Sequence, residues 1–416
     1  MDDFITKNKN RIVGFFESGS KGNTGCDRIG MEVEHFIVDR ATGCSACYYG
    51  PRGVESILRS LRPQFRDEIM SDGHLIGLRR RDCTVTLEPG AQIELSIIPG
   101  KRIAEIKKTY ETFIEELTSV TDPLGYDTVC AGYRPGDKAE DIPLIPKNRY
   151  RNMDRHFSMT GTCGRNMMRG TGALQISIDY RDEEDFRDKF RTACFISPLL
   201  ALTADNAPVF EGRPYEGHTL RQYIWQNVDD ARTGIPPVID APDFGFEKYA
   251  EYISSVPLIV TSDNDDIYTD RTLDQIYAGS LIEEKQIAHA ASMVFPDVRL
   301  VTYIEIRVGD SMPLPYSMAY AALIKGLFLN TEWLAEQKKA YKAMTSADIA
   351  AAKRTISEKG YDADVYGEKA GIILDRICDA AVKCLPAEER AMPGDMTEMI
   401  KKRETLADRE RRRTAE

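Results

Sequence analysis

Five short segments of the chain carry acidic or amide side chains at alternate positions, with apolar residues between them. They are 30–36, 84–88, 92–97, 174–179 and 303–307, and they contain Glu32, Glu34, Glu88, Glu94, Gln175 and Glu305. Alternate side chains of a strand share one face, so Glu32 and Glu34 would lie about 6.6 Å apart. Carboxylates this close cannot all stay ionised without compensation. Because Mg²⁺ is a usual compensating ion, the pattern predicts an Mg²⁺ site for a phosphate-bearing ligand.

Apolar periodicity predicts the elements that would position these residues. We expect strands near 30–38, 84–97 (a pair turned at 88–90), 127–133, 172–180 and 299–308. Helices are expected near 53–66, 101–121, 183–203 and 279–292, and almost throughout after about residue 315. The stretch 205–245 is rich in Pro, Gly, Asn and Asp and is expected to be irregular. One-sided strands separated by helices predict the α+β class, with an antiparallel or mixed sheet that has one open face.

Composition excludes several kinds of partner. The 416 residues carry a net charge of -11, which argues against general nucleic-acid binding. No run of 18 apolar residues predicts a membrane span, and no secretory signal is visible at the N-terminus. Nine cysteines, an odd number, favour a reducing compartment and a cytoplasmic location. Cys44 and Cys47 are interpreted as two thiols of a loop, with a zinc or redox role as the minority alternative.

No glycine-rich phosphate loop follows any predicted strand, whether of the Gly-x-Gly-x-x-Gly or the Gly-Lys-Ser/Thr type. If ATP binds, it would therefore bind on the sheet, through metals and arginines. A dozen motifs in one order then resemble glutamate–cysteine ligase of the plant and proteobacterial type, in the glutamine-synthetase-like superfamily. They include Gly-x-Glu-x-Glu at 30–34, Leu-Glu-Pro-Gly-Ala-Gln-Ile-Glu at 87–94, Met-Met-x-x-Thr at 167–171, Asp-x-x-Arg-Thr-Gly at 229–234 and Phe-Pro-x-Val-Arg-Leu at 295–300.

The resemblance, which covers about residues 28–312, implies a fold and a reaction. The fold would be a curved, mostly antiparallel sheet with flanking helices, in a ligase core at 1–314 and a helical C-terminal region at 315–416 packed on it. The reaction would join L-glutamate, through γ-glutamyl phosphate, to L-cysteine at the expense of ATP and with Mg²⁺, as the first step of glutathione synthesis. The implied partners are these small molecules alone, with the chain as a monomer or a homodimer.

The resemblance also implies roles for individual residues. The metal ligands would be Glu32, Glu34, Glu88, Glu94 and Glu305. Arg307, with Glu305, would act in catalysis and bind the ATP phosphates, and Gln175 would contact metal or bound water. The amino-acid substrate would be bound by Arg221, Arg232, Trp225 and Met168, with Arg165 as a further candidate.

Two alternatives remain open at this point. Near the amino-acid pockets, Gly172 and Ala173 stand where the family pattern has small polar residues, and Ser177 stands where it has an asparagine. A related γ-glutamyl ligase with a different amine acceptor is therefore the second hypothesis. A non-catalytic nucleotide-binding or metal-binding protein is the third. The retained cluster of glutamates argues against it, because a site without function tends to lose costly buried charge. Taken alone, Glu-x-Glu on a strand is more often a solvated face; five such segments reverse that preference.

Overall fold

A nine-stranded sheet lies at the centre of the computed structural model, which describes residues 2–22, 25–261 and 267–415. The strand order is β12-β13-β7-β1-β5-β4-β3-β2, with β6 also paired to β1, and every pairing in this sheet is antiparallel. The strands are β1 (Ile29–Asp39), β2 (Asp67–Ser71), β3 (His74–Arg79), β4 (Cys83–Leu87), β5 (Ile93–Gly100), β6 (Tyr126–Val129), β7 (Ala173–Ile178), β12 (Val298–Leu300) and β13 (Ile304–Asp310).

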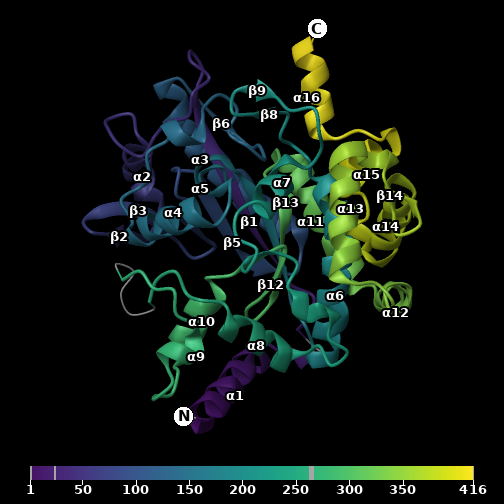
Figure 1. Cartoon of the computed structure of the whole chain (residues 1–416). Helices are drawn as coiled ribbons and strands as arrows, with labels where there is room; N and C mark the ends of the chain where they lie inside the picture. Colours follow the sequence, from purple (N-terminus) through teal and green to yellow (C-terminus); the bar gives the residue numbers. More distant parts are fainter. Residues whose placement is uncertain (1, 23–24, 262–266, 416) are drawn as a thin grey trace.

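Helices surround this sheet and make up most of the rest of the chain (Figure 1). They are α1 (Asp2–Ser18), α2 (Val54–Leu61), α3 (Ile103–Thr121), α4 (Asn148–Thr160), α5 (Gly164–Gly170), α6 (Glu183–Thr203), α7 (Leu220–Gln226), α8 (Phe246–Ser255), α9 (Leu273–Ile276), α10 (Glu284–Ala291), α11 (Leu314–Leu329), α12 (Thr331–Ala340), α13 (Ser346–Lys359), α14 (Ala370–Cys384), α15 (Gly394–Lys402) and α16 (Leu406–Ala415). The predicted α+β class with a mostly antiparallel sheet and a helical C-terminal region is confirmed.

The register of the central strand β1 gives the sheet two unlike faces. Glu32 lies opposite Ser96 of β5 and Gln175 of β7. Glu34 lies opposite Glu94 of β5, and paired residues of antiparallel strands share a face. The intervening side chains are buried and apolar: Met31, Val33, Leu95 and Ile176. The acidic and apolar faces expected from the alternating pattern are therefore present.

Helix α3 packs against β1 and β5 on the face opposite the glutamates. His35 points away from Glu34, is fully buried, and lies 2.9 Å from the hydroxyl of Tyr110 on α3 (Nε2 to Oη). Because the apolar side of the sheet is covered in this way, only its polar side remains for a ligand.

The segment predicted as one strand, 299–308, is instead a hairpin. Strand β12 ends at Leu300, the chain turns through 301–303, and β13 begins at Ile304. Arg299 therefore lies directly opposite Glu305. A single strand would have placed these two residues about 20 Å apart.

Some elements were not predicted at all. Helix α1 packs against α8 at the bottom of Figure 1. The hairpin β2–β3 turns at Asp72 and Gly73, both with positive φ (48° and 80°), which is the Asp-Gly signal of a two-residue hairpin turn. The stretch 205–245 is largely irregular as expected, although it contains the short helix α7.

The helices after residue 315 lie together on one side of the molecule (Figure 1), and α11 packs against α3 and β7. A small hairpin, β14 (Asp364–Val365) with β15 (Glu368–Lys369), interrupts them near the expected break at 360–361. Lys353 of α13 makes a buried ion pair with Asp297, with 2.5 Å between Nζ and Oδ2. The boundary at 314/315 remains a prediction. None of the described helices is both long and apolar enough to cross a membrane.

Candidate active site

A cavity of about 320 Å³ lies over the polar face of the sheet. Its wall combines the sheet with α4, α5, α7 and the loops at 88–92 and 292–299. The charged or polar side chains that line it are Glu32, Glu34, Thr86, Glu88, Gln92, Glu94, Lys147, Arg149, Tyr150, Thr171, Gln175, Arg221, Ser292, Arg299 and Arg307, with Met168 and Trp225 among the apolar ones. Carboxylates and guanidinium groups in one cavity suit a ligand that carries anionic groups together with cations.

Four of the predicted metal ligands meet in this cavity. Burial, with Glu94 and Glu305 close by, raises the pKa of Glu32 to about 8. Burial and Glu88 raise the pKa of Glu94 to about 7, although Thr86 donates a hydrogen bond to it (2.8 Å). Burial also raises the pKa values of Glu34 and Glu88. These carboxylates are therefore costly to ionise together unless a cation joins them.

The donor set of the cavity fits a hard cation such as Mg²⁺. In the described ranges, no three His, Cys, Asp or Glu side chains are gathered closely enough to hold one ion. Mg²⁺ is commonly held by one or two carboxylates together with waters and substrate phosphates, so such a cage is not required. Gln175 is 5% exposed, and its carbonyl oxygen Oε1 has no partner among the described residues, as expected of a group that awaits a ligand or water.

Glu305 differs from the other four glutamates, because it is buried beneath two arginines. Its Oε2 lies 2.8 Å from Arg299 and 2.7 Å from Arg307, and the side chain is not among those that line the cavity. Burial alone would raise the pKa of Glu305, but the two guanidinium groups outweigh it and lower the pKa. Both arginines contact the same oxygen, Oε2, and a role of Glu305 as a metal ligand remains a prediction. In the present arrangement Glu305 orients Arg299 and Arg307 toward the cavity.

Arg221 reaches the cavity from α7. It is 4% exposed, donates from Nη1 to the carbonyl of Arg307 (2.8 Å), and its guanidinium carbon lies 5.6 Å from the centre of the Trp225 ring. Its Nε–H has no partner among the described residues. Burial lowers the pKa of Arg221, and Glu34 acts in the opposite direction. A buried guanidinium with a free donor is suited to bind a carboxylate.

The loop at 88–92 is fixed by Gln92. Gln92 accepts from the backbone N–H of Gly90 (2.9 Å) and donates to the carbonyl of Thr171 (2.8 Å). Met168 of α5, 1% exposed, closes this side of the cavity. Glu88 and Met168 are thereby held on the same wall.

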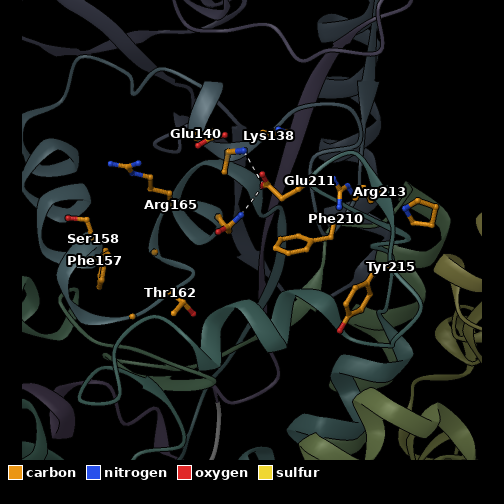
Figure 2. Close-up of a pocket in the computed structure, with 15 residues that line it drawn as sticks. Lys138, Glu140, Phe157, Ser158, Thr162, Arg165, Phe210, Glu211, Arg213 and Tyr215 are labelled. Atoms are coloured by element: carbon orange, nitrogen blue, oxygen red, sulfur yellow. Dashed lines mark hydrogen bonds between the residues drawn. The ribbon is translucent and has the colours of Figure 1, made fainter.

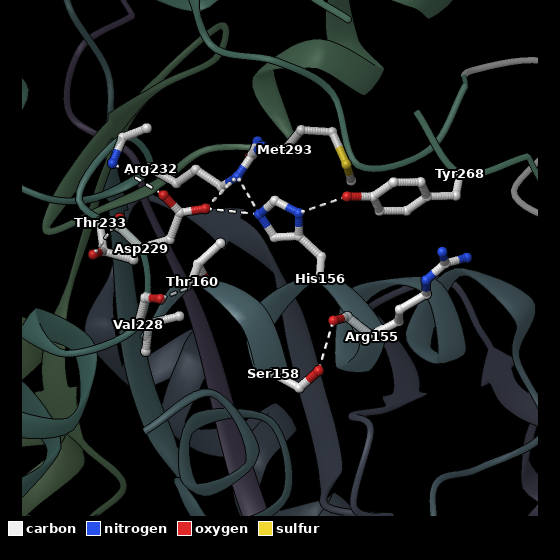
Figure 3. Close-up of polar contacts among 11 residues, drawn as sticks. Arg155, His156, Ser158, Thr160, Val228, Asp229, Arg232, Thr233, Tyr268 and Met293 are labelled. Atoms are coloured by element: carbon white, nitrogen blue, oxygen red, sulfur yellow. Dashed lines mark hydrogen bonds and ion pairs between the residues drawn. The ribbon is translucent and has the colours of Figure 1, made fainter. Parts of the chain in front are cut away.

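Two predicted substrate ligands lie elsewhere. Arg232 is 2% exposed, and Figure 3 shows it against Asp229 and His156 rather than in the cavity. Its Nε lies 2.9 Å from Asp229 Oδ2, and Nη1 donates to the carbonyl of Met293 (3.2 Å). Arg165 is exposed and lines a different cavity. The structure therefore does not bring either arginine to the glutamates.

Sequence reasoning assigned no role to three cations that the structure places in the cavity: Lys147, Arg149 and Arg299. Lys147 and Arg149 belong to a further motif of the resemblance, Pro-Lys-x-Arg-Tyr at 146–150, and this motif was the available signal. Arg299 also stands in a motif of the resemblance, Phe-Pro-x-Val-Arg-Leu at 295–300, but its position beside Glu305 depends on the β12–β13 hairpin, which was not predicted.

Comparison with known proteins identifies the family of this chain and supports its fold. The model of the glutamate-cysteine ligase family 2 matches residues 28–400. The chain therefore belongs to that family, and the expectations from the motifs that it resembles this family and is an enzyme are confirmed.

Among curated relatives, glutamate–cysteine ligase B, chloroplastic, of Oryza sativa subsp. japonica is 30% identical over 338 residues, 78% of this chain and 67% of the relative. The chloroplastic glutamate–cysteine ligase of Brassica juncea is 29% identical over 333 residues, 78% of this chain and 64% of the relative. The chain thus spans about two thirds of the length of these relatives. A solved structure of the Francisella tularensis glutamate–cysteine ligase in complex with AMP shares the fold, with a TM-score of 0.57 at 12% identity over 90% of this chain and 81% of that one.

Proposed function

We propose that the protein joins the γ-carboxylate of L-glutamate to the amine of L-cysteine, with ATP as the energy source and Mg²⁺ as the metal. The family supports the ligase reaction. The observation that carries the proposal is the single cavity in which Glu32, Glu34, Glu88 and Glu94 face Arg221, Arg299 and Arg307. This set offers oxygen donors for a cation and guanidinium groups for phosphates and a carboxylate.

Glutamate would be activated by phosphorylation. Its γ-carboxylate attacks the γ-phosphorus of ATP, the bond to the β–γ bridging oxygen breaks, and ADP leaves. The amine of cysteine then attacks the acyl carbon, loses a proton, and expels phosphate. Both steps ask the protein for positioning and charge stabilisation.

The residues of the cavity divide between these tasks. Arg221 would bind the α-carboxylate of glutamate, with Trp225 and Met168 as walls. Arg307, oriented by Glu305, would bind ATP phosphates, and Arg299, Lys147 and Arg149 would add to the same positive wall. Glu32, Glu34, Glu88 and Glu94, with Gln175 beside them, would hold the metal. When bound, Mg²⁺ would neutralise charge that develops on the transferred phosphoryl group.

The sharpest test is product formation by the purified chain. With ATP, Mg²⁺ and glutamate, we expect ADP release that depends on cysteine, and mass spectrometry should show γ-glutamylcysteine. The variant Glu94→Gln removes one metal ligand and keeps the side-chain volume, so it should lose this activity. ADP release that is the same with and without cysteine would contradict the proposal.

A different amine acceptor is the second candidate, and one local feature favours testing it. A side-chain carbon at Gly172 would lie 2.5 Å from the carbonyl oxygen of Ala131 and 2.9 Å from the Phe36 ring, so the small polar residue of the family pattern does not fit here. A panel of amino-acid acceptors at fixed glutamate separates the two. A cytoplasmic location is also part of the proposal, although the plant relatives are named chloroplastic.

A further inference from the structure

A second cavity, of about 760 Å³, lies against the same helices, α4 and α5, but shares no lining residue with the glutamate-lined cavity. Figure 2 shows the side chains around it. The lining residues that could bind a ligand through charge or ring contacts are Lys138, Glu140, Arg165, Phe210, Glu211, Arg213 and Tyr215. Its size falls in the range of about 300–1,000 Å³ in which small organic ligands are bound. We call it the outer cavity.

Three cations surround the outer cavity without counter-ions. Lys138, Arg165 and Arg213 make no ion pair or side-chain hydrogen bond with any residue that the structure describes. They come from three separate segments, before α4, in α5 and in β9 (Arg213–Pro214). Each alone would be an ordinary solvated side chain. Together around one hollow they create a positive potential that favours anionic groups.

A carboxylate is held among these cations. Glu211 accepts hydrogen bonds at one oxygen, Oε1, from the hydroxyl of Tyr133, from Asn166 Nδ2 (2.8 Å) and from the backbone N–H of Ala139 (3.1 Å). Its other oxygen, Oε2, has no hydrogen-bond partner in the described part of the chain and is left to the cavity. A carboxylate fixed in this way can accept from a ligand ammonium.

The backbone conformation of Glu211 is strained, so placing this carboxylate in the turn costs conformational free energy. Glu211 and Gly212 form the two-residue turn between β8 (Val209–Phe210) and β9, with φ of 52° and 73°. Asn, Asp or Gly suits the first position of such a turn, and a glutamate there is strained. Backbone strain of this kind persists where surrounding contacts enforce it, and it concentrates at binding sites.

We propose that the outer cavity, whose volume of about 760 Å³ is far larger than one amino acid fills, binds a short acidic peptide with two carboxylates and one ammonium. Lys138, Arg165 and Arg213 would bind the carboxylates, and Glu211 would bind the ammonium. A purely anionic ligand would meet Glu140 and Glu211 as well as the cations. The class includes γ-glutamylcysteine, so the biological meaning rests on the proposed function, whereas the binding itself does not.

The outer cavity and the candidate active site are lined by the same two helices, α4 and α5. Arg165 and Asn166 line the outer cavity, and the next two residues of α5, Met167 and Met168, line the glutamate-lined cavity. Phe157 and Ser158 of α4 face the outer cavity, while Met153 of the same helix faces the other. A peptide in the outer cavity would therefore contact the two helices that wall the catalytic site.

Titration calorimetry with γ-glutamylcysteine, without ATP or Mg²⁺, tests the binding independently of any turnover. We expect the double variant R165Q/R213Q to weaken binding at least tenfold. The matched control R66Q/R151Q removes two exposed arginines that line neither cavity, and it should bind as the unaltered chain does. Glu211→Asn, which suits the turn, should keep the hairpin and also weaken binding. Free glutamate should bind at least tenfold more weakly than the peptide, and ATP should not compete.

Hydrogen exchange locates the ligand without relying on variants. The peptide should protect amides of 157–166 and 209–215. The proposal is overturned if the peptide does not bind, if R165Q/R213Q binds it unchanged, or if protection appears only around the glutamate-lined cavity. Equal binding of glutamate would overturn the peptide assignment, and competition by ATP would overturn the zwitterionic class. A chain that binds the peptide but makes no γ-glutamylcysteine would refute the proposed function and leave this inference standing.

Discussion

Replacing Glu305 by Ala should both destabilise the fold and lower turnover strongly. The carboxylate is 1% exposed and joins two guanidinium groups at 2.7 and 2.8 Å. Its loss leaves Arg299 and Arg307 side by side without their counter-ion. Removal of one partner from a buried ion pair costs about 3–5 kcal/mol, a large part of a typical unfolding free energy of about 5–15 kcal/mol. Because Arg299 and Arg307 would no longer be held in position to bind phosphate, turnover should also fall by on the order of 10²-fold.

Urea unfolding followed by circular dichroism measures the first effect, and ADP release measures the second. Glu68→Ala is the matched control, because Glu68 pairs with Arg62 at 2.7 Å on the surface, with 40% and 41% of the side chains exposed. That loss should cost less than about 1 kcal/mol. Glu305→Gln keeps the volume and should fall between wild type and Glu305→Ala. Equal unfolding free energies for Glu305→Ala and Glu68→Ala, or unchanged turnover, would refute the reasoning.

Three further predictions follow from the same site and its surroundings. Arg221→Gln should raise the KM for glutamate at least tenfold, since the carboxylate grip is lost, whereas Arg165→Gln should leave it unchanged in initial-rate assays. Mg²⁺ alone should raise the melting temperature by relieving repulsion among the glutamates, and Glu94→Gln should reduce that rise; an identical rise in both proteins would exclude Glu94 as a ligand. Burial and Asp205 raise the pKa of Asp310 to about 8. The folded state therefore holds a proton that the unfolded state releases near pH 4, and stability falls as pH rises between these values. Asp310→Asn should escape this loss, so its melting temperature should exceed that of wild type by a margin that widens from pH 5 to pH 8.

The polar face of the sheet could be predicted from sequence because it depends on local alternation. Glu32, Glu34 and Glu94 each lie within a strand whose side-chain period is two, so their common face follows from the chain itself. The position of Gln175 opposite Glu32 needed only the correct strand pairing. The order of the family motifs indicated the remaining residues of the polar face.

The errors concern residues whose position depends on distant parts of the chain. Arg299 reaches Glu305 through a hairpin that has no turn signal in Val301-Thr302-Tyr303, so the sequence favoured one long strand. Arg232 belongs to a family motif and Arg165 flanks one, but whether such an arginine points into the cavity is decided by tertiary packing. The dipeptide Asp72-Gly73 is a sequence signal for the β2–β3 turn, although this hairpin was not among the predicted strands.

The buried ion pair between Lys353 and Asp297 limits how far this enzyme can be truncated from its C-terminus. Asp297 adjoins Arg221 and Arg307, accepts a hydrogen bond from Ser197 (3.2 Å), and receives its only described counter-ion from α13. A chain truncated ahead of Ser346 would leave the Asp297 carboxylate without its ion-pair partner Lys353, next to the arginines of the candidate active site. A shortened variant of the enzyme would therefore need a neutral residue in place of Asp297. Relatives that lack the last helices should likewise have a neutral residue at this position.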